Sequence, residues 1–115
     1  MLLRLHASLP SDVMLVIDQA YSEYLTPEED DGGLDLARHA PNVIVTRTFS
    51  KIHGLAAERI GWGYGSAEAV AAMHRTRAPF CITTAGQQAS LRPLCSTDCI
   101  ETRRAPTMRW AAPPP

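Results

Sequence analysis

Three short apolar runs constrain the fold of this chain more than any other feature. They read VMLVI at 13–17, NVIVT at 42–46 and IGWGYG at 60–65. Each is a continuous run of apolar or small residues rather than an alternation of apolar and polar ones. Continuous runs of this length are typical of strands that are buried on both faces of a sheet. We therefore predict three strands inside a sheet that is covered on both sides.

The segments between these runs predict how the strands are connected. A polar loop, TPEEDDGG, and a short helical stretch, LDLARHA at 34–40, separate the first two runs. A strand, a crossover of this length and a second strand form a βαβ unit, whose strands are parallel. Ser66 and Thr83 or Thr84 are good N-caps for two further helices, at 67–77 and 82–95. The sequence thus predicts an α/β fold with a mostly parallel sheet and flanking helices.

Composition narrows the class of protein. A chain of 115 residues with 45% hydrophobic and 20% charged residues is typical of one soluble globular domain. The net charge of -1 gives no reason to expect nucleic acid or a membrane surface as a partner. The longest apolar run is far shorter than the about 20 residues of a membrane span. The three cysteines lack the pattern of a metal site or a disulfide framework, so we expect no metal and a cytoplasmic location.

Polar residues stand at the ends of the predicted strands. Asp18 directly follows the first run and Tyr21 comes three residues later, while Lys51 follows the second run and Arg59 precedes the third. Ligands of open α/β sheets bind at the carboxyl edge of the strands, so these groups could converge there. Each also has an ordinary structural explanation: a turn cap, a solvated lysine or an ion pair. From the residues alone, both readings stay open.

Two motifs resemble a known family. The segments VIDQAYSEY at 16–24 and NVIVTRTFSKIHGLAAERIGWGYG at 42–65 are similar to the pyridoxal-phosphate (PLP) region of fold-type I, class I/II aminotransferases. The closest likeness is to the histidinol-phosphate aminotransferases, and it runs from about Leu3 to Gln88. Both motifs keep the order and spacing of the family. Gln19 departs from it, because glutamate is usual there.

The resemblance implies a role for each catalytic candidate. Lys51 would form the Schiff base with PLP through its unprotonated amine and then carry a proton as general acid–base. Asp18 would keep the pyridine nitrogen of PLP protonated, so that the ring can accept electrons. Tyr21 would bind the phenolic oxygen of the ring.

The resemblance also implies a phosphate-binding group. Ser50 and Arg59 would hold the phosphate of PLP, and Thr48 would be a weaker member of this group. The whole cofactor-binding set is then Asp18, Tyr21, Thr48, Ser50, Lys51 and Arg59.

The resemblance implies a piece of a longer enzyme. Residues 1–95 correspond to part of a large PLP domain, and 96–115 read as a helix-like segment with a disordered proline-rich tail. The implied activity is amino-group transfer between an amino compound such as histidinol phosphate and 2-oxoglutarate, in histidine biosynthesis. Full-length members would be homodimers. Two alternatives remain: a truncated remnant without catalysis, and a related PLP decarboxylase.

Overall fold

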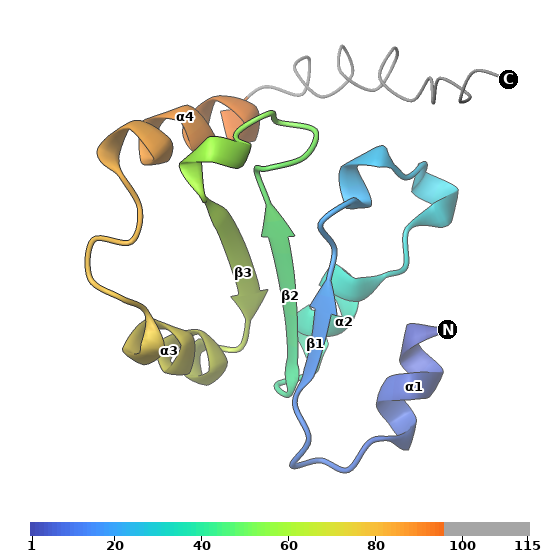
Figure 1. The fold of residues 1–115 in the computed structure, drawn as a ribbon. Helices are drawn as coiled ribbons and strands as arrows, with labels where there is room; N and C mark the ends of the chain where they lie inside the picture. The colour runs from blue at the N-terminus through green and yellow to red at the C-terminus, as the bar shows by residue number, and fades with distance from the viewer. Residues whose placement is uncertain (96–115) are drawn as a thin grey trace, which may run out of the picture.

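The computed structural model describes residues 1–95, which form a three-stranded sheet with surrounding helices (Figure 1). The strands are β1 (Leu15–Asp18), β2 (Val43–Thr48) and β3 (Gly61–Gly65), in the spatial order β1-β2-β3. β1 and β2 are parallel, with Asp18 opposite Thr46. β2 and β3 are antiparallel, with Thr48 opposite Gly61. The predicted βαβ unit is therefore confirmed, and the sheet as a whole is mixed rather than mostly parallel.

The direction of β3 follows from its connection. A parallel strand needs a crossover that returns along the sheet, usually through a helix. Residues 49–60 contain only the short 3-10 helix η3 (Ala56–Glu58), and Phe49 N–H donates to Ile60 O at 3.2 Å. The chain therefore turns back at the edge where β2 ends, and β3 runs in the opposite direction.

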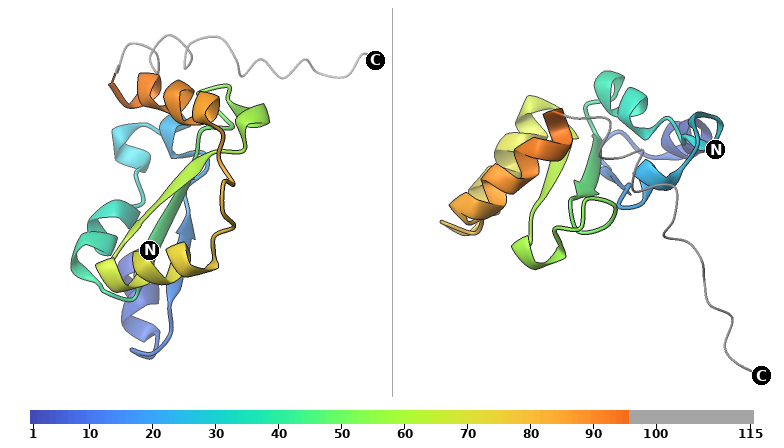
Figure 2. Two further views of the ribbon diagram at one scale, coloured as in Figure 1. Left: turned by 90° about the vertical axis from the view of Figure 1, so that its left-hand side faces the viewer. Right: turned by 90° about the horizontal axis from the view of Figure 1, so that it is seen from above.

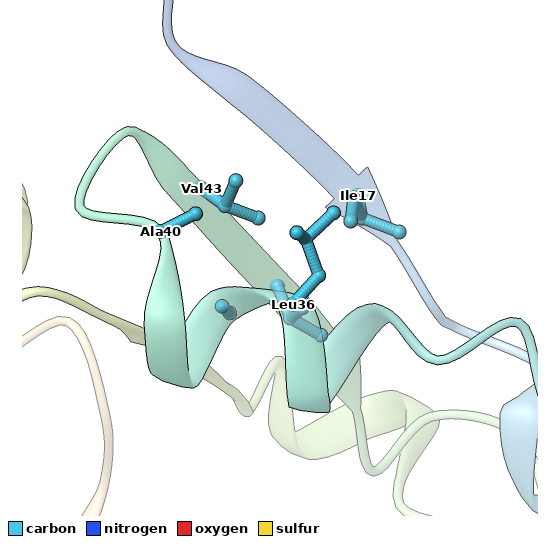
Figure 3. Packing of buried hydrophobic residues seen from close by; sticks show 6 residues of the cluster. Ile17, Leu36, Ala40 and Val43 are labelled. Atoms are coloured by element: carbon cyan, nitrogen blue, oxygen red, sulfur yellow. The ribbon is translucent and has the colours of Figure 1, made fainter. Parts of the chain in front are cut away.

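The core lies between the first two strands and α2 (Gly33–His39). Figure 3 shows Leu36 and Ala40 of the helix region facing Val43 and Ile17. The cluster consists of Ile17, Leu36, Ala37, Ala40, Val43 and Val45. Burial of these apolar side chains fixes the helix against the β1–β2 pair. The helix predicted at 34–40 is confirmed.

Burial on both faces, expected for all three strands, is seen only in β2. Its first three residues are buried, whereas Val16 of β1 is 58% exposed and β3 contains no buried residue. The difference has a geometric cause. β1 and β3 are the outer strands of the sheet, and α2 covers one face of β1 only. Apolar character predicted the strands correctly but not which of their faces are covered.

Two further helices, α3 (Ala67–Thr76) and α4 (Thr84–Cys95), begin where the sequence predicts. A third helix, α1 (Leu2–Ser8), was not predicted from the sequence. The Ser66 hydroxyl accepts from Ala69 N–H at 3.3 Å, and the Thr83 hydroxyl accepts from Gly86 N–H at 3.0 Å, so both predicted caps are confirmed. Figure 2 shows α3 and α4 beside β3, at its two ends. Across residues 1–95, none of the helices is long and apolar enough to cross a membrane. The segment predicted at 96–115 lies outside the described residues.

Candidate functional site

One edge of the sheet gathers all six predicted site residues. The carboxyl ends of β1 and β2 lie there, and so does the start of β3, because β3 is antiparallel (Figure 1). Had β3 been parallel, the residue preceding it would have stood at the opposite edge. We call this edge the rim, defined by Asp18, Tyr21, Thr48, Ser50, Lys51 and Arg59.

A closed loop presents Lys51 at the rim. Phe49 and Ile52 on either side are buried, with 3% and 4% of their surface exposed, while Lys51 itself is exposed. Two backbone bonds of 2.9 Å close the loop, from Gly54 N–H to Lys51 O and from Leu55 N–H to Phe49 O. Gly54 has a φ of 71°, a left-handed conformation that glycine adopts without steric cost. The anchored apolar neighbours therefore hold the lysine outward.

Lys51 lies against Tyr21, although thirty positions separate them in the sequence. The Nζ atom is 4.9 Å from the centroid of the tyrosine ring, within the range of a cation–π contact. The ring of Tyr24 lies 6.1 Å from that of Tyr21 and tilts against it. The structure thus brings together an amine and a phenol that follow different strands.

Asp18 ends β1 with its side chain exposed. Its Oδ1 atom accepts from Ala20 N–H at 3.2 Å and from the Thr46 hydroxyl at 3.5 Å. These bonds are those of an ordinary turn at the end of a strand. Both involve Oδ1, so Oδ2 is the oxygen that can bind a donor from a ligand. The structural and the functional interpretation of this carboxylate are therefore compatible.

Thr48 precedes and Arg59 follows the loop that carries Lys51. Thr48 Oγ1 accepts from Ser50 N–H at 3.0 Å, so its own O–H proton can be donated elsewhere. Arg59 adopts φ 50° and ψ 43°, a left-handed conformation that is unfavourable for arginine. Its Nη1 donates to Ala56 O at 2.8 Å, which fixes the guanidinium beside η3. Strained backbone of this kind clusters at ligand-binding sites.

A buried polar group behind the rim, Gln19, was not predicted from the sequence. Gln19 is only 5% exposed, and Arg47 donates two hydrogen bonds to its side-chain oxygen, at 3.1 and 2.9 Å. One signal was available: residues alternate between the faces of a strand, so the neighbour of an outward Asp18 must face inward.

Within residues 1–95, no three His, Cys, Asp or Glu side chains are placed to hold a metal ion.

Comparisons of the sequence with known proteins identify the family of this chain. The family model for aminotransferase class I and II matches residues 3–109. The histidinol-phosphate aminotransferase of Sphingopyxis alaskensis is 63% identical over 109 residues, which is 95% of this chain and 29% of the relative. That of Erythrobacter litoralis is 55% identical over 101 residues, covering 88% of this chain and 28% of the relative.

A solved structure shares the fold. The histidinol-phosphate aminotransferase of Sinorhizobium meliloti, in complex with pyridoxal-5'-phosphate, matches 90% of this chain and 28% of its own, with a TM-score of 0.80 and 30% identity. This chain therefore spans less than a third of the length of these relatives. Over that length, the chain is similar to these relatives in both sequence and fold. The chain belongs to the aminotransferase class I and II family.

Proposed function

We propose that this chain is the lysine-bearing part of a PLP-dependent aminotransferase. Its amino donor would be histidinol phosphate or a similar amino compound, and its acceptor 2-oxoglutarate. One observation carries the proposal: Lys51, the only lysine in the chain, lies on the rim beside Tyr21, in the loop that follows β2. The relative from Sinorhizobium meliloti, solved with PLP, supports the choice of cofactor.

The groups on the rim fit the chemistry of PLP. This cofactor carries a dianionic phosphate, a basic ring nitrogen, a phenolic oxygen and an aldehyde. For the phosphate, the rim offers the hydroxyls of Ser50 and Thr48 and the fork of Arg59, which matches phosphate oxygens. For the ring, it offers the carboxylate of Asp18 and the phenol of Tyr21. For the aldehyde, it offers the amine of Lys51. Each part of the cofactor thus has a partner of suitable chemistry.

When bound, PLP supplies a ring that withdraws electrons from the carbon next to the substrate nitrogen. Side chains of this chain would bind the cofactor and move the protons. Lys51 Nζ would hold the cofactor through its aldehyde, and it would serve as the general acid–base that moves the proton of the substrate carbon. The Asp18 carboxylate would keep the ring nitrogen protonated, and the Tyr21 phenol would donate to the phenolic oxygen.

Covalent mapping tests the proposal. The test protein is a chimaera: the Sphingopyxis alaskensis relative with its matching segment exchanged for this chain, where 63% identity favours intact packing. After incubation with PLP and reduction with borohydride, peptide mapping should find one cofactor on Lys51. The same labelling of the chain alone is simple to interpret, because Lys51 and the N-terminus are its only amines. Label spread over several lysines of the chimaera, with none enriched, would refute the assignment.

Arg59→Ala should weaken the binding of PLP to the chimaera. Loss of a hydrogen bond to a charged group costs roughly 1.5–3 kcal/mol, so the dissociation constant should rise about 10- to 100-fold. Arginine and alanine both carry a Cβ, so the cost of the left-handed backbone is the same in both. Fluorescence titration measures the affinity, and excess PLP should restore much of the activity. Arg38→Ala, an exposed arginine on α2, is the control. Equal affinities for both variants would remove Arg59 from the site.

A segment without catalysis of its own is the second candidate. It is favoured by the exposure of apolar side chains that a larger domain would cover, such as Val16 at 58% and Leu3 at 71%. Glutamate formation by this chain alone, compared with that by the chimaera, separates the two candidates.

A further inference from the structure

Gln19 is a buried amide, and each of its backbone and side-chain polar groups has a hydrogen-bond partner. Its backbone N–H donates to Thr46 O at 2.9 Å, and its backbone oxygen accepts from Ser22 N–H at 3.2 Å. In the side chain, Oε1 accepts from Arg47 Nε at 3.1 Å and from Nη2 at 2.9 Å, while Nε2 donates to Asp31 Oδ1. A buried network that bonds each of these groups favours one local geometry.

The partners of Gln19 belong to different parts of the fold. Asp31 Oδ1 also accepts from Gly33 N–H at 2.8 Å, at the start of α2. Arg47 belongs to β2, where its guanidinium lies 3.8 Å from Glu23 and 5.4 Å from the ring centroid of Trp62. The amide therefore ties the end of β1 to β2 and to the loop that leads into α2.

Beside Asp31, the chemistry of position 19 favours an amide over the glutamate that is usual in the family. Gln19 accepts from a cation, Arg47, and donates to an anion, Asp31. A glutamate could still accept from Arg47, but it has no N–H for Asp31. It would instead place a second carboxylate against the first, and like charges this close repel each other strongly. Residue 19 and residue 31 are thus chemically matched to each other.

We propose that Gln19 is a positioning residue for the rim, and that its amide acts through the match with Asp31. Neighbouring strand residues point to opposite faces, so holding Gln19 on the buried side keeps Asp18 on the open side and sets the path toward Tyr21. This inference rests on the proposed function, because the rim residues matter only if they bind the cofactor. A displacement of about 1 Å at such groups can cost up to about 100-fold in rate.

The test compares Gln19→Glu, Asp31→Asn and the double variant in the chimaera. Gln19→Glu should lower kcat about 10- to 100-fold, leave KM for the amino donor within about twofold, and shift the pH at which the visible absorbance of bound PLP changes. The double variant should recover most of kcat and the original pH dependence, since an asparagine at 31 can donate to a glutamate at 19. Two controls are matched to these variants. Gln88→Glu makes the same change at an exposed glutamine. Gln19→Glu combined with Asp30→Asn places the new amide at the residue next to Asp31.

The outcomes separate this inference from the proposed function. The positioning role is overturned if Gln19→Glu behaves like Gln88→Glu, if Asp30→Asn rescues as well as Asp31→Asn, or if kcat falls only in proportion to the unfolded fraction. If the unchanged chimaera binds no PLP, the proposed function fails instead. In that case the pairing of residues 19 and 31 is tested by urea unfolding instead of by activity. A double variant that is no more stable than Gln19→Glu would overturn the pairing.

Discussion

Lys51→Ala should remove nearly all transamination by the chimaera while leaving its fold intact. The loss should be about 10⁴-fold in kcat, the upper end of what one general acid–base contributes, because the same amine also holds the cofactor. The fold should be unaffected because the side chain is exposed and its described contact is the face of Tyr21. Losing an exposed cation–π contact costs at most about 1 kcal/mol. Glutamate production and thermal unfolding measure the two effects separately.

Lys51→Arg separates the amine from its charge. An arginine keeps a cation that can stack on Tyr21, but a guanidinium is not deprotonated in proteins and so cannot attack the cofactor or move a proton. We therefore expect it to be as inactive as Lys51→Ala. If Lys51→Arg instead retained a tenth or more of the activity, Lys51 would act only as a positive charge, and the amine chemistry would have to be assigned to another residue.

Local sequence was sufficient for the β1–α2–β2 unit and for the helix caps. Continuous apolar runs and a helical stretch before Pro41 determine a βαβ unit almost regardless of the rest of the fold. The hydroxyls of Ser66 and Thr83 act on backbone N–H groups three residues away, so their effect is readable from the sequence. These features depend on neighbours in the chain.

The direction of β3 could not be obtained in the same way. The run at 60–65 predicts a strand but contains nothing that fixes its orientation. Orientation depends on the path of residues 49–60, which is set by the burial of Phe49 and Ile52 and by the backbone bond between Phe49 and Ile60. That direction decides whether Arg59 stands at the rim. The placement of one candidate site residue therefore rests on tertiary packing.

The role of Gln19 was hidden for a related reason. Its side-chain partners, Asp31 and Arg47, lie 12 and 28 positions away in the sequence. The sequence showed only a glutamine next to the catalytic candidate Asp18. Its burial, and the pairing of its amide with one cation and one anion, appear only once the strands and α2 are assembled. The gathering of Lys51 and Tyr21 was anticipated because both follow strands whose order and direction the βαβ rule supplies.

Asp18→Asn should reduce the activity of the chimaera about 10²- to 10³-fold, comparable to the loss of one charge-stabilising group in an active site. A neutral amide cannot hold the proton on the ring nitrogen of PLP. The substitution preserves the local hydrogen bonds, because an asparagine oxygen can still accept from Ala20 N–H and from the Thr46 hydroxyl. The turn that ends β1 is therefore kept, and only the charge is removed.

Asp18→Ala completes the comparison, because it removes both the charge and the turn acceptor. If the carboxylate serves the cofactor, Asp18→Asn should be nearly as inactive as Asp18→Ala, while its unfolding midpoint stays close to that of the unchanged chimaera. If Asp18 is only a cap at the end of the strand, Asp18→Asn should keep near-normal activity and only Asp18→Ala should be impaired. Activity and unfolding of the two variants together therefore decide between the turn and the cofactor, the two roles that the geometry of Oδ1 and Oδ2 leaves compatible.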